Sequence, residues 1–305
     1  MSASVTGAAD LAQAQPHAVR LASGVELHLV EGGAGAPLVF VHGVMGDWRS
    51  WAPQWPAFTP HFRCISYSRR YNHPNRNDMP SPDHSALVEA EDLRGLLDAL
   101  ALPSALFVAS SYGAFVVLAL ALTQPTRVRA LVAVEPAMMG YAAFSPEGRQ
   151  AWQAFRDTVI QPATAAFRAG DDATGALRMT GGIHHEGSTA LQGPALQRRL
   201  QNARAMRMLA LSSDEFPLLP PAALRALPMP VLLVTGADTP RLHAEVFRNV
   251  AAAMPQATTA TVAGAGHAVA ADAPQAFNGL ALGFLWRTLA SAASDAPAGA
   301  PAGPR

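Results

Sequence analysis

One serine in the chain has the surroundings of a nucleophile on a sharp strand-to-helix turn. Residues 109–113 have the sequence ASSYG, which follows an apolar run and precedes the helix-favouring AFVVLALAL. Such a turn needs small residues two positions before and after the nucleophile, because bulk there would collide with the backbone. Ala109 and Gly113 satisfy this around Ser111, whereas the residues that flank Ser110 are bulky. The motif therefore predicts Ser111 as the nucleophile, with a polar helix N-cap as the structural alternative.

A histidine far along the chain has the position of a general base. His267 lies in the sequence GAGHAVA, after the last apolar run and before a helical pattern. Open α/β sheets bind ligands at the carboxyl ends of their strands, so we expect His267 at the same edge as the nucleophile. His184, His185 and Glu186 resemble metal ligands, but adjacent helical residues point apart and no further ligand pattern is present. We therefore expect no metal.

A third motif supplies donors for a developing negative charge. The sequence HGV at His42-Gly43-Val44 closes another apolar run. In this position the backbone N–H of Val44 would join that of Tyr112 as an oxyanion hole, and each such donor is typically worth about 3–4 kcal/mol. We expect His42 and Ser110, which adjoin these groups, to contact the substrate. An ordinary turn is the alternative for the His-Gly pair.

These motifs need a sheet to bring them together. Short apolar or β-branched runs alternate with helical patterns, for example in residues 85–102, where leucines recur at a helical period. Runs that are apolar at nearly every position are typical of parallel strands covered on both faces. The sequence therefore predicts an α/β fold with a doubly wound, mostly parallel sheet. The expected strands are Val25–Val30, Leu38–His42, Phe62–Tyr67, Ala105–Ala109, Ala130–Glu135, Val231–Thr235 and Thr258–Val262.

The strand pattern is interrupted once, which defines the domain organisation. Residues 137–228 contain helical patterns without a clear strand and are predicted to form an inserted helical cap on a core of residues 22–136 and 229–290. Residues 1–21 are expected to be loosely ordered and residues 291–305 to be a disordered tail. The cap contributes large apolar residues, some of which should line an adaptable pocket: Met138, Met139, Trp152, Phe155, Phe167, Met179, Met206 and Met208.

With these motifs in this order, the chain resembles the α/β-hydrolase superfamily from about Val25 to Leu289. The segments that carry the resemblance are PLVFVHGVMGDWRSW, LFVASSYGAFVVLAL, ALVAVEP, PVLLVTGADTP and GAGHAVAADAPQAFN. The resemblance implies the chain order nucleophile, acid, histidine and the family's usual cap. It carries little information about the substrate.

The acid of the catalytic triad departs from the family's common pattern. Many relatives end the seventh strand with Gly-x-x-Asp-Pro, but the equivalent position here holds Thr239, and Asp238 is one residue early. Other relatives carry the acid at the end of the sixth strand, where this chain has Glu135. We favour Glu135 and keep Asp238 as the alternative, since either carboxylate can orient His267 and stabilise its cation.

A second departure follows the strand Phe62–Tyr67. Many relatives have an Asp-x-Arg-Gly-x-Gly turn there, whereas this chain has SRRYNH at residues 68–73. Arg69 or Arg70 has two interpretations: it binds a substrate carboxylate, or it is a structural arginine paired with carboxylates of the core.

Composition excludes several other classes of protein. Lys and Arg together number 22, as do Asp and Glu, and no basic run is present, so we expect no nucleic-acid partner. The single cysteine, Cys64, excludes an internal disulfide and multi-cysteine metal sites. Neither an export signal nor eighteen consecutive apolar residues occurs, so a cytoplasmic protein without a membrane partner is expected.

The sequence thus predicts a cofactor-independent serine hydrolase with a small to medium apolar substrate. Ser111 would attack an ester-like or activated carbonyl, and the acyl-enzyme would be released by water. Within the same fold, a C–C hydrolase, a lactonase, or a cofactor-free lyase or perhydrolase is an alternative, because fold does not fix chemistry. A catalytically silent ligand-binding protein is the alternative from another class. A homo-oligomer is compatible with the sequence.

Overall fold

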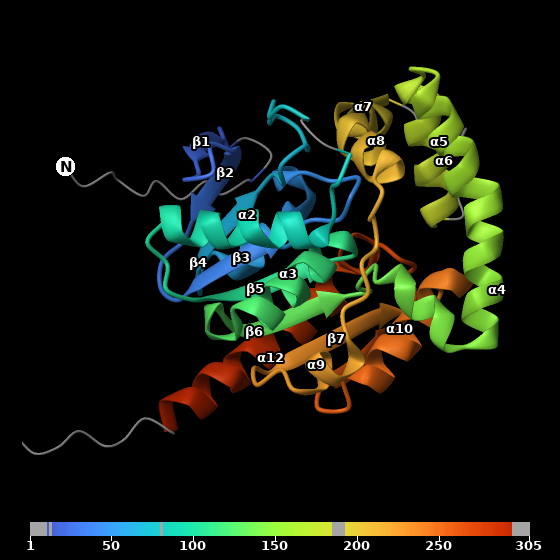
Figure 1. Cartoon of the computed structure of the whole chain (residues 1–305). Coiled ribbons are helices and arrows are strands. Elements are labelled where there is room, and N and C mark those ends of the chain that lie inside the picture. The colour runs from blue at the N-terminus through green and yellow to red at the C-terminus, as the bar shows by residue number, and fades with distance from the viewer. Residues whose placement is uncertain (1–10, 12–13, 80–81, 185–192, 295–305) are drawn as a thin grey trace, which may run out of the picture.

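An eight-stranded sheet forms the centre of the protein (Figure 1). The structure, a computed structural model, describes residues 11, 14–79, 82–184 and 193–294. The strand order is β1-β2-β4-β3-β5-β6-β7-β8; β2 is antiparallel to both its neighbours, and the pairs from β4 to β8 are parallel. This confirms the predicted α/β fold with a mostly parallel sheet. The strands are β1 (His17–Arg20), β2 (Glu26–Gly32), β3 (Pro37–Val41), β4 (Arg63–Tyr67), β5 (Ala105–Ser110), β6 (Val128–Val134), β7 (Val231–Gly236) and β8 (Thr258–Val262).

Helices cover the sheet on both faces, which explains why its central strands are apolar throughout. Successive side chains of a strand point to opposite faces. In β5, Phe107 belongs to one core cluster, with α2 (Ala86–Ala99), α3 (Tyr112–Thr123) and α10 (Arg241–Ala253). Its neighbour Val108 belongs to the other cluster, with α1 (Trp55–Phe58), α11 (Val269–Asp272) and α12 (Pro274–Ser294). The sheet is therefore held between two apolar cores, one on each face.

The segment between β6 and β7 consists, in the residues that the structure describes, of helices joined by loops, with no strand. Figure 1 shows α4, α5 and α6 standing together at the right of the view, beside the end of the sheet. We call α4 to α8, with the π-helix η5, the inserted helices. The elements are η4 (Met139–Phe144), α4 (Pro146–Phe155), η5 (Arg156–Ile160), α5 (Gln161–Arg168), α6 (Asp172–His184), α7 (Gly193–Gln201), α8 (Ala203–Leu211) and α9 (Pro221–Arg225).

The first strand was not predicted. β1 lies within residues 1–21, which were expected to be loosely ordered, and it pairs antiparallel with β2 through a short turn at residues 21–25. Its side chains are mostly exposed, so the strand has no apolar alternation to mark it. β1 is stabilised by its pairing with the neighbouring strand β2 and not by an apolar face of its own.

The C-terminal helix extends beyond the limit predicted for the core. Helix α12 runs to Ser294, beyond the expected core limit of residue 290, and the rest of the expected tail lies outside the described residues. In the part of the chain that the structure describes, no helix combines the length and apolar character of a membrane span.

Candidate active site

Ser111 lies on the sharp turn between β5 and α3. Its backbone has φ 53° and ψ −121°, a left-handed conformation that costs a non-glycine residue on the order of 1–3 kcal/mol. The Ser111 N–H donates to Val134 O on β6 at 2.8 Å, which holds the turn in place. A Cβ atom on Gly113 would lie 2.4 Å from Val41 O, so no larger residue fits there. This is the crowding that the small-x-Ser-x-small pattern predicts.

His267 joins the serine to a buried carboxylate. Its Nε2 atom lies 3.0 Å from Ser111 Oγ, and its Nδ1 atom lies 2.6 Å from Glu135 Oε2. His267 comes from the loop after β8, which packs closely on the end of β7. A Cβ atom on Gly236 would lie 2.2 Å from Ala265 O. The three side chains therefore form one hydrogen-bonded chain at the carboxyl edge of the sheet.

Glu135 follows directly after β6, at φ 41°, and is itself held by three donors. Thr235 Oγ1 and Gly236 N donate to Oε1 at 2.7 and 2.9 Å, and Thr239 Oγ1 donates to Oε2 at 2.7 Å. Burial by itself would raise the pKa of Glu135, but the bonds from His267, Thr239 and Gly236 outweigh it and lower the pKa. Glu135 is therefore charged at neutral pH.

Asp238, the alternative acid, does not reach His267. Its side chain is exposed, and its backbone N–H donates to Ala265 O at 2.9 Å, so the residue belongs to the turn after β7. Thr239, which occupies the position where many relatives have aspartate, donates to Glu135 instead. The structure thus brings Glu135, and not Asp238, to His267.

The two expected oxyanion residues, Val44 and Tyr112, line the same cavity as Ser111. Tyr112 is the first residue of α3, so its N–H has no acceptor within the helix. Asn72 fixes the loop that carries Val44, because its Nδ2 atom donates to Val44 O at 3.0 Å and to Gly46 O at 2.7 Å. Asn72 was not predicted as a site residue. The only signal was that it lies in residues 68–73, where the sequence differs from the turn common in the family.

Arg69 and Arg70 are paired with carboxylates of α2. The Arg69 side chain is only 2% exposed and donates to Glu89 at 2.5 Å and to His42 O at 3.1 Å. Arg70 makes two hydrogen bonds with Asp92, at 2.5 and 2.6 Å. These contacts match the structural interpretation of the two arginines. Neither residue lines the cavity at Ser111.

His42 and Ser110, which were expected to contact the substrate, lie outside that cavity. His42 is buried; its Nε2 atom accepts from Arg69 N at 3.1 Å, and its Nδ1 atom lies 2.8 Å from Gly43 O. Burial, with the charge of Arg69, lowers the pKa of His42 to about 3, so the ring is neutral. His42 therefore supports the loop at Gly43.

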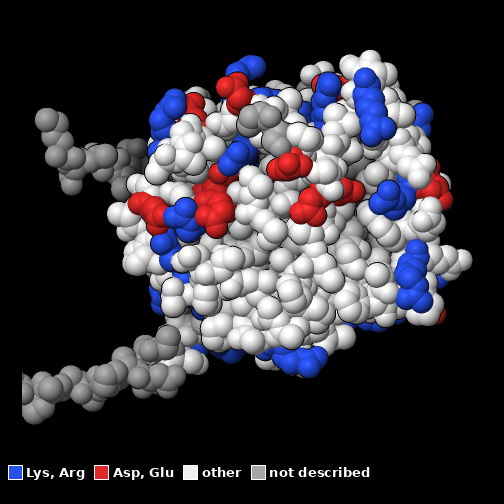
Figure 2. Space-filling model, in the orientation of Figure 1, with Lys and Arg blue, Asp and Glu red and all other residues white. Residues whose placement is uncertain are grey.

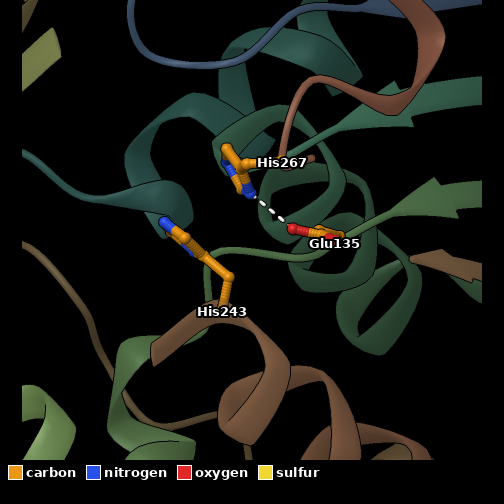
Figure 3. Close-up of side chains that lie close together, drawn as sticks. All are labelled: Glu135, His243 and His267. Atoms are coloured by element: carbon orange, nitrogen blue, oxygen red, sulfur yellow. Dashed lines mark hydrogen bonds and ion pairs between the residues drawn. The ribbon is translucent and has the colours of Figure 1, made fainter. Parts of the chain in front are cut away.

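A second histidine, His243 of α10, stacks on His267. The ring centroids are 3.8 Å apart and the ring planes differ by 22°. Figure 3 shows His243 and His267 side by side with Glu135, and one ligand atom of each lies within 4.8 Å of the others. Nitrogen lone pairs lie in the ring plane, so those of two stacked rings run alongside each other and do not converge on one point. His267 Nδ1 is also already bonded to Glu135, and the cluster therefore fits a cation poorly.

The other histidine considered as a metal ligand, His184, ends α6 with its ring centroid 6.0 Å from that of His267. Burial and the charge of His267 lower the pKa of His184 to about 3. His185 and Glu186 lie outside the described residues. His243 was missed by sequence reasoning, because a single histidine on the buried face of a helix carries no pattern.

Two cavities adjoin these groups. The inner cavity, of about 30 Å³, contains Ser111 and is otherwise bounded mainly by apolar side chains. The outer groove, of about 530 Å³, lies between α4, η5, α6 and the first turn of α10. Phe155 and His243 line both. Of the large apolar residues expected to shape a pocket, three line the inner cavity: Met139, Phe155 and Met179.

The remaining members of that expected set pack away from the inner cavity. Met138, Phe167 and Met206 are buried in the core cluster that contains Phe107, and Trp152 packs against this cluster. Met208 forms a small cluster with Tyr71 and Ala205.

Comparisons with known proteins find hydrolases of similar sequence and fold. Among curated relatives, RutD of Caulobacter sp. (strain K31) is 26% identical over 271 residues, which cover 85% of this chain and 94% of that protein. The 2-(acetamidomethylene)succinate hydrolase of Mesorhizobium japonicum is 26% identical over 255 residues, covering 82% and 88% of the two chains. Among solved structures, carboxylesterase CesB of Bacillus subtilis has a TM-score of 0.67 at 22% identity and covers 90% of this chain and 93% of its own.

The family assignment rests on the length of the match. The profile of the Alpha/beta hydrolase family matches residues 38–280, a range that begins in β3 and includes Ser111, Glu135 and His267. The match extends over well more than half of the chain. This protein belongs to the alpha/beta hydrolase family.

Proposed function

We propose that this protein is a cofactor-independent serine hydrolase that cleaves esters or similarly activated carbonyl compounds through an acyl-enzyme. The observation that carries the proposal is the hydrogen-bonded chain from Ser111 Oγ through His267 to Glu135. Glu135 accepts from Nδ1–H and so fixes the tautomer in which Nε2 is free to take the serine proton.

The proposed reaction proceeds in two halves. Ser111 Oγ attacks the carbonyl carbon while its proton moves to His267 Nε2, and the N–H groups of Val44 and Tyr112 bind the oxyanion. His267 then gives this proton to the departing oxygen, and the acyl group stays on Ser111. In the second half a water molecule gives a proton to His267 and attacks the acyl carbon. The bond to Ser111 Oγ then breaks, His267 returns the proton to Oγ, and the acid leaves with the serine regenerated.

The inner cavity supports a short acyl group. A cavity needs roughly 10–15 Å³ to hold one water molecule, so a space of about 30 Å³ takes only a methyl-sized or slightly larger substituent beside the reacting carbonyl. The apolar side chains around Ser111 favour an uncharged acyl chain. We therefore place the acyl part of the substrate at the small end of the size range predicted from the sequence.

A serine-directed fluorophosphonate probe tests the proposal, with the intact protein analysed by mass spectrometry. The wild type and Ser110→Ala should each gain one adduct, and Ser111→Ala should gain none. With p-nitrophenyl acetate, Ser111→Ala should lower kcat by roughly 10⁴–10⁶-fold. A folded wild-type protein that is neither labelled nor active on short-chain esters would instead be the ligand-binding alternative.

A further inference from the structure

The charged side chains that line the outer groove are cationic. Its charged lining side chains among the described residues are Arg178 of α6 and Arg241 of α10, and no carboxylate lines it. The groove also receives the N-terminal turn of α10, whose N-cap residue, Pro240, provides no side-chain cap. The first N–H groups of a helix carry partial positive charge, so this wall adds to the field of the arginines.

These two arginines differ from many others in the chain. The chain contains no lysine, so all 22 cationic side chains are arginines, and every blue group in Figure 2 is one of them. Many are paired, as Arg69 and Arg70 are with α2. Within the described residues neither Arg178 nor Arg241 has an ion pair; Arg241 donates to the neutral Gln150 at 3.2 Å. Their charges are therefore available to a ligand in the groove.

The groove adjoins the catalytic histidine and not only the inserted helices. The groove and the inner cavity adjoin at Phe155 and His243, because each of these residues lines both. His243 also stacks on His267. In an acyl transfer the leaving group must lie within reach of the histidine that protonates it. Of the two cavities, the groove is the one with room for a leaving group, and it borders the ring of His243 that stacks on His267.

We propose that the outer groove binds the leaving group of the substrate, and that this leaving group carries a carboxylate held by Arg178 and Arg241. The acyl part, limited by the inner cavity, is short and uncharged. This inference rests on the proposed serine-hydrolase function and specifies its substrate class: short-chain acyl esters of an alcohol or phenol that bears an anionic group.

Matched pairs of synthetic esters test the proposal. The first pair is 4-acetoxybenzoate and its methyl ester, which share the acetyl group and differ by a charge on the leaving group. The second pair, monophenyl glutarate and its methyl ester, places the charge on the acyl side. Values of kcat/KM are measured for the wild type, for Arg178→Gln with Arg241→Gln, and for Arg168→Gln, an exposed arginine of α5 that does not line the groove.

We expect the double variant to lose about tenfold in kcat/KM for 4-acetoxybenzoate and less than twofold for its methyl ester. Arg168→Gln should change neither value. Added salt should weaken the wild-type preference for the anionic leaving group, because the arginines are exposed. Thermal melts should show that the double variant is folded, since both side chains lie at the surface.

Three results would overturn the inference. If both acetate esters respond alike to the double substitution, the groove does not recognise a carboxylate, although hydrolysis dependent on Ser111 would leave the proposed function intact. If only the glutarate pair responds, the charge belongs to the acyl side. If the wild type hydrolyses none of the esters and the fluorophosphonate does not label Ser111, both proposals are wrong.

Discussion

The two walls of the candidate active site are built in different ways. On the sheet side, Ser111, Glu135 and His267 each follow a strand, and hydrogen bonds from neighbouring backbone and side chains fix their positions. On the side of the inserted helices, the inner cavity is bounded by flexible or bulky apolar residues such as Phe155, Met179 and Leu209. One wall is held by directional bonds and the other by packing.

This difference separates the chemistry from the selection of the substrate. Hydrogen-bonded groups on strand ends cannot shift without breaking bonds in a buried site, so their geometry is rigid. Methionine and other apolar side chains exchange rotamers at low cost, and the π-helix η5 lies in the same wall. Substitutions on the sheet side should therefore change kcat or stability, and those on the helical side should change which substrates are accepted.

After the loss of Ser111 itself, the largest expected effect comes from breaking the bond between the acid and the histidine. Glu135→Gln should lower kcat by on the order of 10²–10⁴-fold, because the imidazole loses its counter-charge and the control of its tautomer. Asp238→Asn is the matched control and should cost less than about tenfold, since Asp238 is exposed and does not contact His267. Ester kinetics and thermal melts of both variants are the measurements. Equal small losses would contradict a role for Glu135.

A second substitution tests the rigidity of the sheet side at the loop of His42 and Gly43, whose carbonyl oxygens accept from Arg69. Glu89 is buried and bonded to both Arg69 and His84. Glu89→Gln leaves the buried Arg69 without its partner charge and should lower the free energy of unfolding by about 3–5 kcal/mol at pH 7. Urea unfolding measures this. Glu91→Gln, on the exposed face of the same helix, should cost about 0.5 kcal/mol or less.

The same pair predicts a pH dependence. Burial would raise the pKa of Glu89, but the charge of Arg69 and the bond to His84 outweigh it and lower the pKa from 4.5 to about 2. A carboxyl whose pKa is lower in the folded state stabilises the protein above the unfolded-state value, and this stabilisation disappears as the pH falls through the folded-state value. The difference in unfolding free energy between wild type and Glu89→Gln should therefore be constant above about pH 5 and shrink between pH 4.5 and 2. A constant difference across that window would contradict the lowered pKa.

The smallest effect is expected on the helical side and concerns selectivity. Met179 lines the inner cavity, and Met179→Ala should enlarge it, so that kcat/KM for a p-nitrophenyl hexanoate rises about tenfold relative to the acetate. Met206, which is fully buried without lining the cavity, is the control. Met206→Ala should lower stability by roughly 2–5 kcal/mol and leave the preferred chain length unchanged. The reverse pattern would mean that Met179 does not limit the acyl group.

The seven predicted strands and the elbow at Ser111 are local properties, which explains why the sequence predicts them. An apolar run flanked by helical patterns indicates a buried parallel strand, and the small residues around Ser111 follow from crowding within one turn. β1 was missed because its exposed residues show no alternation; its partner strand stabilises it. The family resemblance narrowed the acid to Glu135 or Asp238, since both follow strands that end at the same edge.

The tertiary structure decided the contacts between residues far apart in the chain. Glu135 reaches His267 across 132 residues because β6 and β7 are neighbours and the loop after β8 folds back over them. The pairing of Arg69 with Glu89, the stacking of His243 on His267 and the charge of the outer groove arise in the same way. None of these has a signature in spacing, because each depends on two elements whose relative position is fixed by the packing of the whole sheet. The sequence determined which groups can react, and the fold determined which of them meet.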